Sequence, residues 1–169
     1  MVVTFQEFKN TIVNTIATQN VGLTSGCFDL LHKTQIHYLN KCKEQCDFLI
    51  VLVDSDDLCY SHKNKKPVIN ELDRAYTLSN LKAVDCVIVM NNLNMLTNIC
   101  ESIFLRTRKL TTVFKHYHKI YNNDLIKILG NYVIIEDINS FSSTTEIVNF
   151  IKNNNNESKN RRQTRKSRC

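Results

Sequence analysis

Glycine and proline are scarce in this chain, which has three glycines and one proline among 169 residues. The glycines form neither G-x-G-x-x-G nor G-x-x-x-x-G-K-[ST], so the two commonest glycine-rich cradles for phosphate are excluded. No two of the seven cysteines have the C-x-x-C spacing of zinc sites and redox motifs. Their odd number and scattered positions fit a reducing compartment.

Long apolar segments are also missing. The longest apolar run, residues 48–53, is far shorter than the roughly 20 residues that a membrane span needs. The N-terminus lacks the basic segment, apolar stretch and small-residue cleavage site of a signal peptide. We therefore expect a soluble cytoplasmic protein with no membrane partner.

The net charge of +6 lies entirely in the C-terminal segment. Residues 1–151 contain 15 basic and 15 acidic residues, whereas residues 152–169 contain seven basic residues and one acidic residue. This segment has no aliphatic or aromatic residue, so we expect a disordered tail. It could bind nucleic acid, direct nuclear import or contact an acidic partner. The alternative is a solubilising extension with no specific partner.

The rest of the chain alternates between helical and strand periodicity. Capping boxes predict helices over 5–18 and 143–151, and further helices are expected at 35–45, 70–82, 95–105 and 123–129, the last stopped by a left-handed Gly130. Apolar runs predict strands at 21–25, 48–53, 86–90, 111–115 and 133–135. The pattern indicates an α/β fold with a doubly wound five-stranded parallel sheet, whose ligands bind beyond the carboxyl ends of the strands. The expected organisation is an N-terminal helix (1–20), one domain (21–151) and the tail (152–169).

One loop carries the most specific motif. Residues 26–32 read G-C-F-D-L-L-H between a predicted strand and a helix, and this segment resembles the opening of the cytidylyltransferase-like nucleotidyltransferases. The resemblance continues through K-P-V at 66–68, E-L-D-R at 71–74 with V-D at 84–85, and S-T-T at 143–145. It covers about residues 21–151. Within the family, the chain is most similar to the enzymes that act on glycerol 3-phosphate and heptose phosphate.

The resemblance implies a Rossmann-like nucleotidyltransferase fold and the transfer of AMP or CMP from ATP or CTP to a phosphorylated sugar or polyol. It also implies Mg²⁺ as a cofactor and a possible homodimer. Nucleotidyl transfer needs placed cations and donors more than covalent work from the protein. The residues expected to act in catalysis are His32, Gln35, Lys66 and Arg74. Those expected to bind the nucleotide are Gly26, Cys27, Phe28, Asp29, His32, Gln35, Ser143, Thr144 and Thr145; Lys63 and Lys65 add basic charge nearby.

The chain departs from the family pattern at the signature H-x-G-H, which here reads His32-Lys33-Thr34-Gln35. Further departures are the bulky segment K-H-Y-H at 115–118 and F-S at 141–142. These changes support an alternative function, namely a catalytically inactive family member that binds a nucleotide or a partner.

Several of these residues also have ordinary structural explanations. Asp29 could bond backbone amides in its turn, and Arg74 could lie on a solvated helix face. A metal site at His116 and His118 lacks a third ligand with defined spacing, so no metal-ligating residue is assigned. Cys42 and Cys46, one helical turn apart, are expected in the core and not at a zinc ion, and Cys27 is expected to be a small packed side chain.

Overall fold

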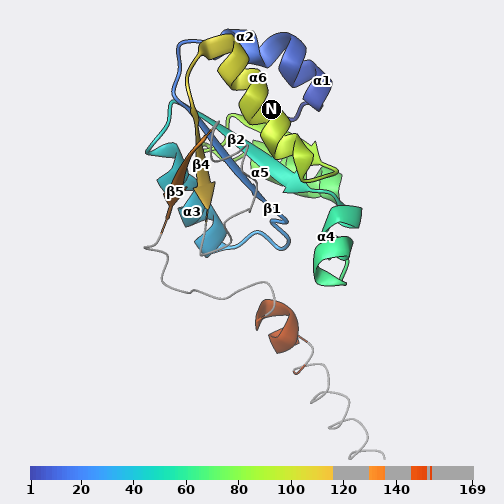
Figure 1. Ribbon diagram of the computed structural model, residues 1–169. Coiled ribbons are helices and arrows are strands. Elements are labelled where there is room, and N and C mark those ends of the chain that lie inside the picture. Colours follow the sequence, from blue (N-terminus) through green and yellow to red (C-terminus); the bar gives the residue numbers. More distant parts are fainter. Residues whose placement is uncertain (116–129, 136–145, 152, 154–169) are drawn as a thin grey trace, which may run out of the picture.

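The sheet is the centre of the computed structural model, which describes residues 1–115, 130–135, 146–151 and 153. Its strands are β1 (Val21–Gly26), β2 (Phe48–Asp54), β3 (Cys86–Met90), β4 (Thr111–Lys115) and β5 (Gly130–Ile134). They form one sheet in the order β3-β2-β1-β4-β5, and all neighbours pair in parallel (Figure 1). The chain winds from β1 through β2 to β3 on one side and through β4 to β5 on the other, which confirms the doubly wound sheet.

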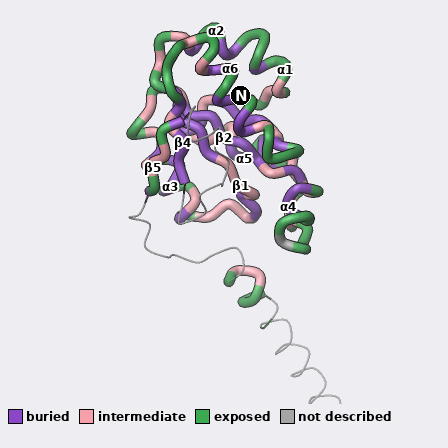
Figure 2. Tube along the Cα trace, viewed as in Figure 1, coloured by how far each residue is buried: buried purple, intermediate pink, exposed green. Residues whose placement is uncertain are grey.

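Helices cover both faces of the sheet because side chains alternate along each strand. Leu49, Val51 and Val53 of β2 pack on the face covered by α3 (Lys33–Lys43) and α5 (Glu71–Ser79). Ile50 and Leu52 pack on the opposite face with α6 (Asn94–Thr107). β1, β2, β3 and β4 are accordingly largely buried, whereas β5 at the edge of the sheet is mostly half-buried or exposed (Figure 2). Burial on both faces explains why β2 is apolar at every position before Asp54.

The N-terminal segment is part of the same core. It is helical from α1 (Phe5–Glu7) through a π-helical turn, η1 (Phe8–Ile12), to α2 (Val13–Thr15). The predicted capping box is present, with the Thr4 N–H donating to Glu7 Oε2 at 2.7 Å and the Glu7 N–H donating to Thr4 Oγ1 at 3.2 Å. Phe8 is fully buried beside α6, and the Val3 N–H donates to the Val87 carbonyl of β3 at 3.0 Å.

Two local predictions are wrong, and one helix was not predicted. Gly130 is the first residue of β5 and does not have the left-handed φ expected of it, and this strand covers Gly130–Ile134 where 133–135 was predicted. The additional helix is α4 (Asp56–Lys63). Its signal in the sequence is Ser55, whose Oγ accepts the Leu58 N–H at 3.1 Å, followed by two acidic residues that suit a helix N-terminus.

The C-terminal part is described only in pieces. Residues 146–151 are helical, as the capping box predicts, yet Phe150 and Ile151 are 68% and 52% exposed. The predicted helix 123–129 and all of the tail except Asn153 lie outside the described residues. None of the described helices combines the length and apolar composition that crossing a membrane requires.

Candidate functional site

The carboxyl ends of the strands form the edge at which a ligand is expected. In doubly wound sheets, ligands bind beyond this edge, at the point where the strand order reverses. Here the order reverses between β1 and β4, which are neighbours in the sheet. The residues at the carboxyl ends of the three strands nearest this point are Gly26 of β1, Asp54 of β2 and Lys115 of β4.

The loop from β1 to α3 has an unusual backbone. Phe28 and Leu30 have φ angles of 50° and 46°, in the left-handed region that non-glycine residues rarely adopt. The Phe28 ring is buried against Gly26, where an added Cβ would lie 3.3 Å from Phe28 Cε2. Gly26 therefore leaves space for the ring that anchors this loop. Such strained residues persist only where the surrounding structure holds them, and they cluster at binding sites.

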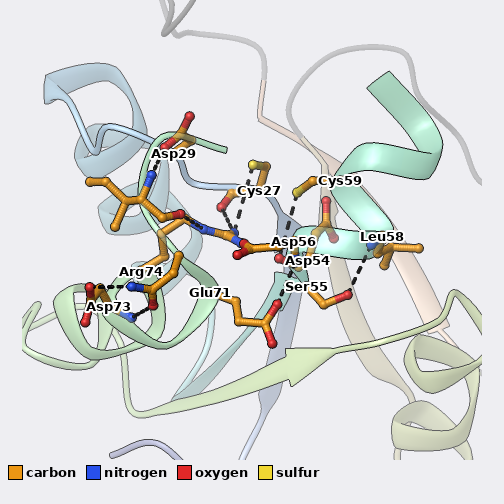
Figure 3. A network of polar contacts seen from close by, with 12 residues as sticks. Cys27, Asp29, Asp54, Ser55, Asp56, Leu58, Cys59, Glu71, Asp73 and Arg74 are labelled. Atoms are coloured by element: carbon orange, nitrogen blue, oxygen red, sulfur yellow. Dashed lines mark hydrogen bonds and ion pairs between the residues drawn. The ribbon is translucent and has the colours of Figure 1, made fainter. Parts of the chain in front are cut away.

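Arg74 links three segments beneath this loop (Figure 3). Its side chain is 0% exposed and pairs with the Asp56 carboxylate at the start of α4. It also donates hydrogen bonds to the carbonyls of Cys27, in the β1–α3 loop, and of Ile69, before α5. Glu71 adds another link, because its Oε2 accepts the Asp56 N–H at 2.6 Å. All these contacts are with protein groups, so the phosphate contact expected of Arg74 stays a prediction.

Asp29 fixes the same loop from its other side. The carboxylate is buried, and its two oxygens accept the N–H groups of Val68 at 3.0 Å and of Ile69 at 3.1 Å. A bond from Asp29 to backbone amides was expected within its own turn. These two amides belong to the segment before α5, so Asp29 joins the β1–α3 loop to the chain that carries Arg74.

The altered signature lies at the start of α3. His32 is the N-cap residue, and its backbone N–H donates to Gln35 Oε1 at 3.2 Å, so Gln35 helps to cap its own helix. Thr34 is buried. Burial lowers the pKa of His32 below its ordinary value of 6.5, so the ring is neutral at pH 7. The His32 side chain faces the backbone N–H of Gln35 in a reciprocal capping box, and its Nδ1 is buried at the N-terminus of α3. His32 and Gln35 therefore cap this helix together.

Lys115 is a site candidate that sequence reasoning did not assign. It is 8% exposed, and its Nζ donates to Ser25 Oγ of β1 at 3.1 Å. Burial lowers the pKa of Lys115 to about 8, while the carboxylate of Asp54 acts in the opposite direction. The amine is therefore mainly protonated at pH 7. The available signal was a lysine directly after the buried residues of a strand, at the end where such sheets bind ligands.

The structure gives less information on the contacts of the remaining predicted site residues. Lys65 and Lys66 are exposed between α4 and α5, and Lys63 is the last residue of α4. The residues expected to close the site at the last helix lie outside the described residues, and their roles stay predictions; they are Ser143, Thr144 and Thr145.

The described residues include no group of three or more His, Cys, Asp or Glu side chains arranged to hold a metal ion. Cys42 is fully buried in the core, as expected, and burial raises the pKa of its thiol to about 12. Mg²⁺ is usually held by one or two carboxylates together with substrate phosphates and water. The Mg²⁺ expected from the family resemblance stays a prediction.

Comparison with known proteins adds independent information. The family model described as cytidylyltransferase-like matches residues 23–161. Bifunctional protein HldE of Granulibacter bethesdensis is 33% identical over 132 residues, which cover 78% of this chain and 27% of that protein. HldE of Helicobacter pylori strain P12 is 43% identical over 79 residues, which cover 46% of this chain and 17% of that protein. The matches thus span less than a third of these relatives.

A solved structure shares the fold. The lipopolysaccharide core biosynthesis protein of Thermoplasma volcanium is 25% identical with a TM-score of 0.57, and the match covers 73% of this chain and 99% of that one. Nearly the whole of that protein therefore corresponds to the fold described above.

Proposed function

Since the chain belongs to the cytidylyltransferase-like family, we propose that it transfers AMP or CMP from ATP or CTP to a phosphorylated sugar or polyol. An oxygen of the acceptor phosphate forms a bond to the α-phosphorus of the nucleotide. The bond from that phosphorus to the oxygen bridging to the β-phosphate breaks, and pyrophosphate leaves. The names of the relatives, which include a lipopolysaccharide core biosynthesis protein, support a sugar phosphate as the acceptor.

The observation that carries this proposal is the rigid β1–α3 loop at the point where the strand order reverses. Asp29 and Arg74 hold its backbone from two sides, and the loop leads directly into the N-terminus of α3, which His32 caps. Nucleotidyl transfer depends on positioning and on stabilising the charge of the phosphates. The N–H groups at a helix N-terminus contribute to both.

The proposal is tested with purified protein, MgATP or MgCTP, and a panel of hexose, heptose and glycerol phosphates. We expect pyrophosphate release that depends on one acceptor, with the nucleotide-linked product identified by mass spectrometry. The matched control is His32→Ala, which should release pyrophosphate at least tenfold more slowly. Absence of product with every acceptor and both nucleotides would remove the enzymatic function.

A second function, nucleotide binding without turnover, is favoured by the altered signature. Gln35 provides no charge and is engaged in capping α3, and Thr34 brings a buried side chain where the family has glycine. Loss of one donor to a transition-state anion typically costs about 10² to 10³ in rate. If the chain is a weakened enzyme, the double variant Thr34→Gly/Gln35→His should release pyrophosphate faster, by a factor of about 10² to 10³. If the variant binds nucleotide in calorimetry but shows no turnover, the non-catalytic function is the correct one.

Binding of nucleic acid through residues 152–169 is a separate proposal. It is supported by the seven basic residues of this tail. Deletion of the tail should abolish salt-sensitive binding of RNA or DNA in a fluorescence titration. Unchanged binding by the truncated protein would show that the tail is not responsible.

A further inference from the structure

Lys115 places a charged amine where burial is costly. The side chain is almost fully buried, and its Nζ donates a hydrogen bond to the neutral hydroxyl of Ser25 at 3.1 Å. Removing an ammonium from water costs several kcal/mol unless other groups compensate. The Asp54 carboxylate contributes by stabilising the protonated amine. A buried ammonium at the edge of the sheet where ligands bind is a candidate for binding an anion.

The position of Lys115 supports this role. The β1–β4 register pairs Leu23 with Val113, and its continuation brings Ser25 beside Lys115 at the carboxyl ends of both strands. β1 and β4 are the two strands between which the winding reverses, and they run side by side in Figure 1. The loop that leaves β1 leads directly to His32 and α3. Lys115 therefore lies at the same edge of the sheet as the altered signature.

Three of the expected site residues add little positive charge at this point. His32 is neutral at pH 7 because burial lowers its pKa, and Gln35 carries no charge. The guanidinium of Arg74 is buried in contacts with Asp56 and two carbonyl groups. Hydrogen bonds to an anion are about twice as strong when the donor is charged. An ammonium beside the β1–α3 loop would thus contribute more to triphosphate binding than the neutral groups there.

We propose that Lys115 binds the phosphates of the nucleotide beyond the carboxyl ends of β1 and β4 and provides the charge that Gln35 lacks. This inference rests on the proposed nucleotide site. Ser25 is a positioning residue, which orients the ammonium through its hydroxyl. Asp54 keeps the amine protonated.

The test measures binding of MgATP and MgCTP by calorimetry at pH 7 to the full chain and to Lys115→Met. We expect the variant to bind roughly 10- to 100-fold more weakly, which is the range for loss of one charge-assisted hydrogen bond. Lys82→Met is the matched control, because Lys82 is exposed and precedes β3 at the opposite edge of the sheet. This control should bind as the wild type does.

Loss of Lys115 also removes a positive charge that offsets Asp54, and this carboxylate would repel phosphate even if Lys115 never touched the ligand. The double variant Lys115→Met/Asp54→Asn separates these effects. If the lysine binds phosphate, the double variant stays weak; if it only neutralises Asp54, wild-type affinity returns and the inference is overturned. Should Lys115→Met fail to unfold cooperatively in urea, Lys115→Gln, which can still bond Ser25, replaces it in both comparisons.

The outcomes distinguish this inference from the proposed function. Normal nucleotide binding by the Lys115 variants overturns the inference and leaves the nucleotide site in place. A wild-type chain that binds neither MgATP nor MgCTP overturns the nucleotide site and the inference together.

Discussion

Replacement of Arg74 by alanine would test whether this residue primarily holds the fold or contacts a ligand. The side chain is 0% exposed and is bonded to two carbonyl groups and to a carboxylate that is itself 33% exposed. Removal of one partner from a buried ion pair costs about 3–5 kcal/mol. Because the Asp56 carboxylate can regain water, we expect a loss of stability near the lower limit, about 3 kcal/mol.

The assay is equilibrium unfolding in urea, followed by circular dichroism. With a slope of about 1–3 kcal/mol per molar urea, this loss lowers the midpoint by roughly 1–3 M. The matched control is Lys41→Ala, which breaks the salt bridge between Lys41 and Glu44. The side chains of these two residues are 40% and 61% exposed. An exposed pair contributes about 0–1 kcal/mol, so the control should unfold almost as the wild type does.

A loss below about 1 kcal/mol for Arg74→Ala would refute the reasoning, because it is smaller than the cost of leaving buried partners unsatisfied. If that variant were stable but bound nucleotide weakly, the phosphate contact expected from the sequence would be supported instead. The Asp56→Asn variant extends the test. In a double-mutant cycle, Arg74 and Asp56 should show a coupling of about 0.5–3 kcal/mol.

Three further predictions concern other contacts. Gly22→Ala places a Cβ 2.6 Å from Cys46 Sγ and from Phe114 Cε2, so urea unfolding should show that the protein loses about 1–3 kcal/mol of stability. The control is Gly26→Ala, where the nearest atom lies 3.3 Å from the added Cβ. A loss of stability no larger than that of the control would contradict this prediction. Asp29→Ala leaves the N–H groups of Val68 and Ile69 without their acceptor, so stability should fall by about 1–3 kcal/mol. Hydrogen exchange at these two amides should also accelerate. Unchanged exchange would show that Asp29 does not hold the segment before α5. Burial raises the pKa of four thiols to about 12, namely those of Cys42, Cys59, Cys86 and Cys100. At pH 8 these thiols are protonated and should react slowly with a disulfide reagent until the protein is unfolded in guanidinium chloride. Rapid labelling of all four in the native state would disprove their burial.

The sequence by itself determined the layered architecture. Burial on two faces makes a central parallel strand continuously apolar, and a helix with one buried side repeats its apolar residues every three or four positions. These are local signals, so the strands at Val21–Gly26, Phe48–Asp54, Cys86–Met90 and Thr111–Lys115 and the Thr4 capping box could be predicted. The β1–α3 loop was also identified, because its residues lie next to one another in the chain.

Only the tertiary structure decided what the individual site residues contact. Arg74 meets Cys27 from 47 positions away in the chain, and Lys115 meets Ser25 from 90 positions away. Such contacts depend on strand order and on which helix covers which face of the sheet. Neither can be inferred from the spacing of residues within a single segment. For this reason the arginine of the E-L-D-R motif lies beneath the loop as a buried link, whereas a lysine outside the expected motifs lies where the strand order reverses.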